Sequence, residues 1–441
     1  MAFLHTHSSE CLKSELDLFS LPPTQTSIES SQWIHYKPVS SISDDCPVEF
    51  VVPGHGEEYL DLAHTMLCVY IDVETTARNP DARDDLHKVG VVNHLLHSMF
   101  NQVDVYFNQK LVSPPNNAYA YRAYIEALLN YSSRAKTTHL TTCLWDTDIP
   151  GRMENLIGGA LPNEALARRS AYIHDGKVLD LMGHLHCDVF NQDKFLINDV
   201  EMRIRLVRSK NSFCFMEPDD ISSKLRICDA TLLVRRVKIS ANMLMAHARM
   251  LSKTTAKYPL TRVEVKTFTI HSGVTRESVD NVILGQLPKR VIVGFVENVA
   301  FNGHKKYNPF NFRNYDINFF SLYHDGTQIP SRPLQPRFSV DHPMYIEAYQ
   351  TLFSGTGIHF LNEGNAISRD DYARGYTLFA FDLTPDLSAN CAEHWNLVKH
   401  GSLRMEVGFE KALESTINAI VYAEFDNVIE IDSSRQVDFA G

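Results

Sequence analysis

The residue types in this sequence that best suit metal chemistry are two histidines spaced two positions apart, His184 and His186, followed by Cys187 and Asp188. Histidines at this spacing on a β-strand point to one side and could share a metal ion. A metal motif of this kind also places a third ligand, a glutamate, a few residues later, but the next glutamate is Glu201. We therefore expect ordinary strand histidines, with no metal site and no cofactor.

Three further motifs each have a structural and a functional interpretation. The stretch Gly54-His55-Gly56-Glu57-Glu58 lacks the lysine and Ser/Thr of a phosphate loop, which favours a turn between strands. The basic run Arg203, Arg205, Arg208 and Lys210 is typical of a solvated strand face paired with acids, and contact with nucleic acid is the minority interpretation. The stretch Leu156-Ile157-Gly158-Gly159-Ala160 resembles the consensus of adenovirus-type maturation proteases, so a turn and a cleavage site at Gly159-Ala160 both stay open.

Composition is that of an ordinary globular protein with room for two cores. The 441 residues are 44% hydrophobic and 22% charged, and the net charge of -11 argues against a protein that coats nucleic acid. Eight cysteines without a CxxC pair predict reduced thiols. With neither a membrane-spanning run nor a signal peptide in the sequence, we expect a soluble, unsecreted chain. No spacing selects catalytic residues.

A repeat organises the chain. Tyr124-Ile125-Glu126-Ala127 recurs as Tyr345-Ile346-Glu347-Ala348 about half a chain later. Each copy lies in a predicted helix and follows a predicted strand, Val103 to Phe107 in one case and Asp316 to Tyr323 in the other. The shared unit is therefore a strand, a turn and a helix.

Later strands match as well. Residues 200–206 and 403–409 alternate apolar and polar side chains, and each is followed by an apolar strand, 225–239 or 417–431. Many short strands punctuated by Gly, Asn and Pro favour a jelly roll. The predicted fold is all-β, a double jelly roll made of two tandem eight-stranded antiparallel β-sandwiches with short accessory helices.

The expected division has four parts. Residues 1–45 form an N-terminal arm, 46–240 the first jelly roll, 241–259 a linker helix and 260–441 the second jelly roll. Helical spacing also predicts a helix over residues 91–100. The long irregular stretches 131–169 and 353–375 are expected to form outer towers or clasps between chains.

Four stretches spread over nearly the whole chain carry a family resemblance. They are Ser14 to Phe19 with Pro22 to Ile28; Pro47 to Phe50 with Tyr59 to Leu62; Tyr307 to Phe312; and Leu403 to Val407 with Ile420 to Asn427. They closely resemble the major capsid proteins of Polinton (Maverick) elements and their adintovirus relatives. This family shares its double jelly roll with virophage and adenovirus major capsid proteins.

The resemblance implies a non-enzymatic protein of the virion. Homotrimers would form pseudo-hexagonal tiles of an icosahedral capsid, neighbouring trimers would contact one another, and a single jelly-roll penton protein would fill the vertices. The arm would link tiles beneath the shell, and no specific nucleic-acid binding is implied. The alternative is a tandem jelly-roll enzyme, either a bicupin metalloenzyme or a metal-free amidase or glycosidase. A carbohydrate-binding double module is a third possibility.

Overall fold

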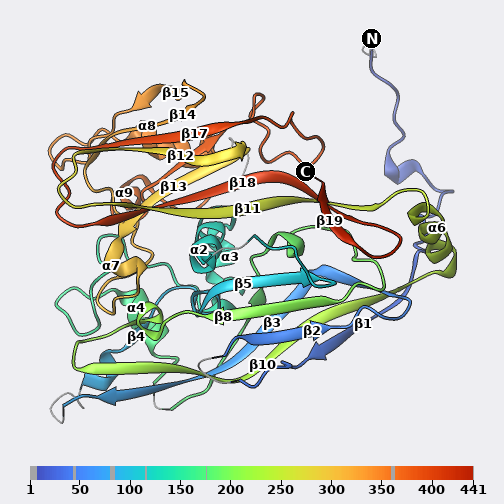
Figure 1. Cartoon of the computed structure of the whole chain (residues 1–441), viewed down its shortest axis with the longest axis horizontal. Helices are drawn as coiled ribbons and strands as arrows, with labels where there is room; N and C mark the ends of the chain where they lie inside the picture. Colours follow the sequence, from blue (N-terminus) through green and yellow to red (C-terminus); the bar gives the residue numbers. More distant parts are fainter. Residues whose placement is uncertain are drawn as a thin grey trace.

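Two β-sandwiches lie side by side, the first drawn in blue to green and the second in yellow to red (Figure 1). The computed structural model describes residues 7–42, 46–79, 85–114, 117–174, 176–358 and 363–440. No helix within these ranges is long and apolar enough to cross a membrane.

The first sandwich consists of two four-stranded antiparallel sheets. One has the order β1 (Ile28–Tyr36), β10 (Ile221–Ile239), β3 (Glu58–Ala77), β7 (Leu179–His184). The other has the order β2 (Val48–Val52), β8 (Met202–Arg208), β5 (Phe100–Phe107), β6 (Lys110–Leu111). In β8 buried and more exposed residues alternate, so one face packs on the core, as the alternating pattern predicts.

The second sandwich repeats this order strand for strand. One sheet runs β11 (Ala256–Ile270), β18 (Ile417–Ile431), β13 (Arg290–Glu297), β16 (Leu378–Asp382), with β19 (Val437–Ala440) added beside β18. The other runs β12 (Arg276–Gln286), β17 (His400–Phe409), β14 (Ile317–His324), β15 (Thr327–Leu334). The predicted double jelly roll of two eight-stranded sandwiches is confirmed.

Short helices connect and cover the sheets. They are α1 (Leu95–Ser98), α2 (Tyr119–Asn130), α3 (Ser133–Thr137), α4 (Glu164–Ser170), α5 (Asn211–Cys214), α6 (Ala241–Leu251), α7 (Asn298–Phe301), α8 (Ile346–Ser354) and α9 (Arg369–Tyr372). The two repeated tetrapeptides lie at the expected places, within α2 and at the start of α8. A two-stranded pair, β4 (Gly90–Val91) with β9 (Phe215–Met216), lies beside the first roll.

Several predicted boundaries were wrong. Strand β1 lies inside the predicted arm and pairs with β10, so the part of the arm without sheet contacts ends before Ile28; residues 1–6 and 43–45 of the arm lie outside the described residues. The predicted helix over 91–100 shrinks to α1, because Val91 pairs in β4 and Phe100 begins β5. Strand β11 begins at Ala256, inside the range predicted for the linker helix, because its pairing with β18 starts there, Ala256 opposite Ile431.

Candidate assembly surfaces and the junction between the rolls

Helix α2 lies between the two rolls and belongs to the core of the second (Figure 1). Every residue from Tyr119 to Leu129 is buried. The ring of Tyr124 stacks on Phe310 with centroids 4.2 Å apart, and Tyr121 stacks on Phe301 at 5.5 Å. Phe310 belongs to the stretch Tyr307 to Phe312 singled out in the sequence, so that stretch is part of the junction.

A charged network on α2 faces the junction. The guanidinium of Arg122 lies 2.9 Å from Glu126 and 2.7 Å from Asp188, and Nδ1 of His186 lies 2.6 Å from the other oxygen of Glu126. Burial alone would raise the pKa of Glu126, but Arg122 and His186 outweigh this effect and lower the pKa to about 2. Glu126 is therefore an ionised partner held in place by its neighbours.

The network continues into the second roll. The hydroxyl oxygen of Tyr422, on β18, lies 3.2 Å from Glu126 and 3.1 Å from Glu424. Arg290 on β13 pairs with Glu424 at 2.9 Å. Buried charges that all have partners fix one relative position of two packed units.

A second buried network joins the rolls through Asp148. Its carboxylate lies 2.7 Å from Arg169 and accepts a hydrogen bond from Asn308 of the second roll at 3.0 Å. Its backbone carbonyl accepts a hydrogen bond from Tyr376 at 2.6 Å. The stretch 131–169, expected to form a tower or clasp, thus contributes directly to the contact between the rolls.

Helix α8 occupies in the second roll the place of α2 in the first, but much of it is open to solvent. Only Ala348, Thr351 and Leu352 are buried. Ile346 is 42% exposed, and Glu347, the repeat counterpart of Glu126, lies 3.0 Å from the exposed Arg332. An open depression of about 800 Å³ runs along this face of α8, between β15 and β16. We call it the α8 face.

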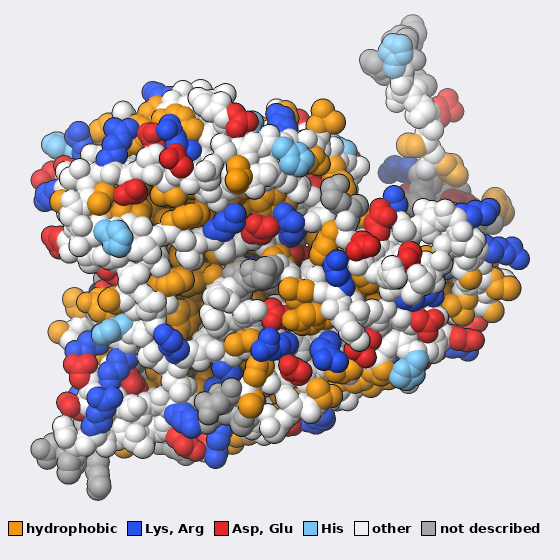
Figure 2. Space-filling model, in the orientation of Figure 1, with side chains coloured by type: hydrophobic (Ala, Val, Ile, Leu, Met, Phe, Trp, Pro, Cys, Tyr) orange, Lys and Arg blue, Asp and Glu red, His pale blue; other side chains and the backbone are white. Residues whose placement is uncertain are grey.

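The N-terminal arm extends away from the body of the molecule (Figures 1 and 2). Its apolar side chains face solvent, Phe19 being 97% exposed; the others are Leu12, Leu16, Leu18 and Leu21. At its base lies a mainly apolar groove of about 530 Å³ between α6, β1 and β11. We call it the α6 groove; its lining includes Ile28, Tyr59, Met243, Met250, Leu251 and Tyr258.

The two histidines considered for metal binding, His184 and His186, do not lie together on one strand face. Strand β7 ends at His184, which is exposed and whose Nδ1 lies 3.1 Å from the carbonyl of Thr65. His186 lies beyond the strand, buried against Glu126. The assumption that both lie on one face of a strand was therefore wrong, because the strand ends between them.

The other sequence motifs lie where structural roles were expected. At Gly54 an added Cβ would lie 2.2 Å from the backbone of Val200, so the turn after β2 needs glycine for this close approach. Arg205 lies 3.6 Å from Glu49 and 3.8 Å from Asp104, as expected for a paired strand face. Gly159 and Ala160 lie in an exposed turn. On the face in Figure 2, basic and acidic side chains are interspersed.

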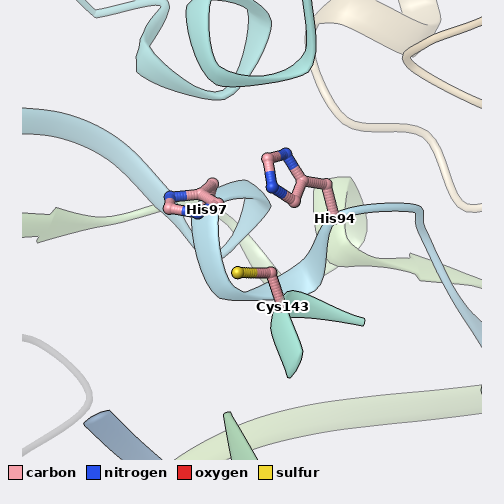
Figure 3. A group of neighbouring side chains, drawn as sticks. All are labelled: His94, His97 and Cys143. Atoms are coloured by element: carbon pink, nitrogen blue, oxygen red, sulfur yellow. The ribbon is translucent and has the colours of Figure 1, made fainter. Parts of the chain in front are cut away.

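One group of potential metal ligands escaped the sequence analysis. His94 and His97, around α1, lie beside Cys143, and the ligand atoms of all three are within 4.8 Å of one another (Figure 3). The spacing of the two histidines, His94-Leu95-Leu96-His97, was a visible signal, since residues three apart share a helix face. Cys143 had none, because only folding brings it near.

The comparisons with known proteins are consistent about the fold. No protein-family profile matches the chain. A Caenorhabditis elegans protein, "Uncharacterized protein F54H12.2", is 25% identical over 430 residues, which cover 94% of this chain and 98% of that protein. Among solved structures, a chain of the Sputnik virophage matches with a TM-score of 0.68 and 13% identity, covering 98% of this chain and 93% of that one. The mavirus major capsid protein matches with a TM-score of 0.55 and 10% identity, covering 100% and 95%.

Proposed function

We propose that this chain is a major capsid protein of the Polinton and adintovirus lineage, which assembles as homotrimers. The observation that carries the proposal is the strand-for-strand repeat of two jelly rolls, packed side by side through α2. Its likeness over nearly the full chain to virophage and mavirus capsid structures supports it. Three such chains place six similar rolls around one axis, so threefold symmetry builds a pseudo-hexagonal tile.

The repeat also indicates how the trimer closes. Within one chain the helix of the first roll, α2, is covered by the second roll. In a ring of six rolls the helix of the second roll, α8, faces the first roll of the next chain. The α8 face is therefore the proposed intratrimer contact, and its lining includes Glu347, whose repeat counterpart Glu126 lies 3.2 Å from Tyr422 across the junction. An obligate contact of this kind buries more than about 2,000 Å².

Contacts between trimers involve the arm. Its exposed apolar residues around Phe19 have no cover in their own chain among the described residues. The α6 groove offers an apolar surface of matching character at the base of each arm. The arm of one trimer binds in the α6 groove of a neighbour, and several weak links per tile together hold the shell.

The remaining partners follow from this role. A tile with sixfold outline cannot fill the fivefold vertices of an icosahedral shell, so a separate penton protein, a single jelly roll, occupies them. The protein resides in the virion. It binds no specific nucleic acid, in keeping with its net charge of -11.

The enzymatic alternative finds less support in the cleft between the rolls. This cleft, of about 630 Å³, contains Glu126, but Arg122 and His186 hold the pKa of that carboxyl near 2, whereas a general acid needs a raised one. A bicupin metalloenzyme would carry a metal-binding site in each roll. Among the described residues, one group of potential ligands occurs, in the first roll.

The proposal is tested by expressing the chain alone and imaging it in negative stain. We expect pseudo-hexagonal particles of uniform size that form sheets or closed shells as protein concentration rises. Featureless monomers at every concentration would contradict the proposal, and assays for hydrolase activity would then follow.

A further inference from the structure

The cluster of His94, His97 and Cys143 is fully enclosed in the first roll. His94 and His97 are each 1% exposed and Cys143 is 4% exposed. His94 lies in the turn before α1, His97 lies within α1, and Cys143 ends the short 3-10 helix His139–Cys143 (Figure 3). The arrangement is thus set by tertiary packing and lies away from the surfaces proposed for assembly.

His94 is the least satisfied member of the cluster. Neither Nδ1 nor Nε2 has a hydrogen-bond partner, although both are buried. A neutral imidazole carries one donor and one acceptor, and leaving both unpaired in a buried site is unfavourable. In a neutral ring one of these two nitrogens carries a lone pair that can bind a metal ion.

The ligand atoms of the other two residues lie within 4.8 Å of each other, and Sγ of Cys143 also lies 3.3 Å from the backbone carbonyl of Met182. Nδ1 of His97 lies 2.9 Å from the hydroxyl of Tyr119, which leaves Nε2 of His97 for a metal. At Gly183 on β7, an added Cβ would lie 2.4 Å from Sγ of Cys143 and 3.7 Å from Nε2 of His97. Glycine at this position therefore leaves room beside both ligand atoms.

We propose that His94, His97 and Cys143 bind one divalent transition-metal ion of the zinc class. Two imidazole nitrogens and one thiolate are ligands that zinc favours, and its tetrahedral bonds place ligand atoms roughly 3.4–3.7 Å apart. The ligand atoms observed here are all within 4.8 Å of one another, and rotations of the side chains bring them into this range. Binding converts the Cys143 thiol to a thiolate and releases its proton to solvent.

The ion would tie α1 to the segment that leads into the Asp148 network. The ring of Trp145 packs edge-on against the ring of His94, with the ring centroids 5.2 Å apart. The backbone N–H of Asp146 donates a hydrogen bond to the side-chain oxygen of Asn93 at 2.9 Å. An ion held by Cys143 and both histidines would therefore fix the chain a few residues before Asp148. The site is structural, and it departs from the expectation that the protein binds no metal.

The test starts from full-length protein purified under reducing conditions, stripped with a chelator and reloaded with Zn²⁺ or Co²⁺. We expect one zinc per chain to remain after gel filtration, and the cobalt form to show tetrahedral bands with a thiolate charge-transfer band. Cys143→Ala should abolish the charge-transfer band and reduce retained zinc at least tenfold. Gly183→Ala should also reduce it, because its methyl group fills the space beside the ligands.

Cys214→Ala is the matched control, since Cys214 is also buried in the first roll and its Sγ lies 3.7 Å from the carbonyl of Ser98, outside the cluster. Retained zinc equal in the Cys143→Ala and wild-type proteins would overturn the proposal. If the variants fail to fold, melting of the wild type decides: the midpoint should rise by several degrees on reloading with zinc, and an unchanged midpoint would overturn it.

Discussion

The hydroxyl oxygen of Tyr422 lies 3.2 Å from Oε1 of Glu126, although 296 residues separate them along the chain. Glu126 lies on the helix of the first roll and Tyr422 on a central strand of the second. Their contact forms only when the rolls occupy one particular relative position. In the proposed trimer each chain carries one such junction inside it and offers the corresponding α8 face to its neighbour.

The first prediction concerns acid stability of this junction. The pKa of Glu126 is about 2 in the folded protein, below the 4.5 of a free glutamate, because Arg122 and His186 outweigh the effect of burial. A depressed folded pKa contributes stability that is complete above pH 4.5 and is lost as the pH falls toward 2. Glu126→Gln should therefore flatten the fall in melting midpoint between pH 5 and pH 3. Parallel pH profiles for wild type and variant would contradict it.

The second prediction compares two adjacent arginines. Arg169 is 1% exposed and pairs with Asp148, whereas Arg168 is 55% exposed and pairs with Asp146, both at 2.7 Å. Arg169→Met leaves Asp148 as an uncompensated buried charge and should cost roughly 3–5 kcal/mol of unfolding free energy. Arg168→Met should cost about 0–1 kcal/mol. Chemical denaturation measures both, and equal losses would contradict the role given to Asp148.

The third prediction concerns the trimer contact. Ile346 on the α8 face is 42% exposed in the single chain, and Ile346→Asp would bury a charge if this face is an interface. We expect folded monomers with an unchanged far-UV spectrum and a trimer dissociation constant raised at least a hundredfold. Leu284→Asp is the control. Leu284 lies on β12, and β12 and β15 form the two opposite edges of one sheet, so this change should leave trimers intact. Normal trimers from Ile346→Asp would exclude the α8 face.

The fourth prediction separates trimer from shell. Deleting residues 1–24 removes the apolar arm but leaves β1 and its pairing with β10. The truncated chain should still form trimers but no shells. Phe19→Asp and Met250→Asp should each weaken shell assembly in the same way, because one alters the arm and the other the α6 groove. Electron microscopy and light scattering check both levels, and intact shells from the truncated chain would contradict the arm's role.

Much of the fold could be predicted because the pattern is local and occurs twice. The bounds predicted for β18 match the structure, and both repeated tetrapeptides lie at the predicted helices. Strand β1 was missed because its side chains are mostly exposed, so its main structural support is pairing with β10. Such an edge strand has no burial pattern to detect.

The site was less predictable for a physical reason. Glu126 and Glu347 stand at the same position of the repeat, yet one is buried in a network and the other is exposed. The difference arises because the second roll covers α2, whereas nothing in the described part of the chain covers this face of α8. No local sequence pattern encodes it. The approach of Cys143 to His94 and His97 likewise depends on two separate segments brought together by folding.

The mass of the purified chain in solution, measured by light scattering across a range of concentrations, tests the central claim most directly. The account predicts a stable particle of three times the 50.1 kDa of one chain, which persists on dilution and becomes monomeric in Ile346→Asp. A wild-type chain that remains a monomer at all concentrations would contradict it.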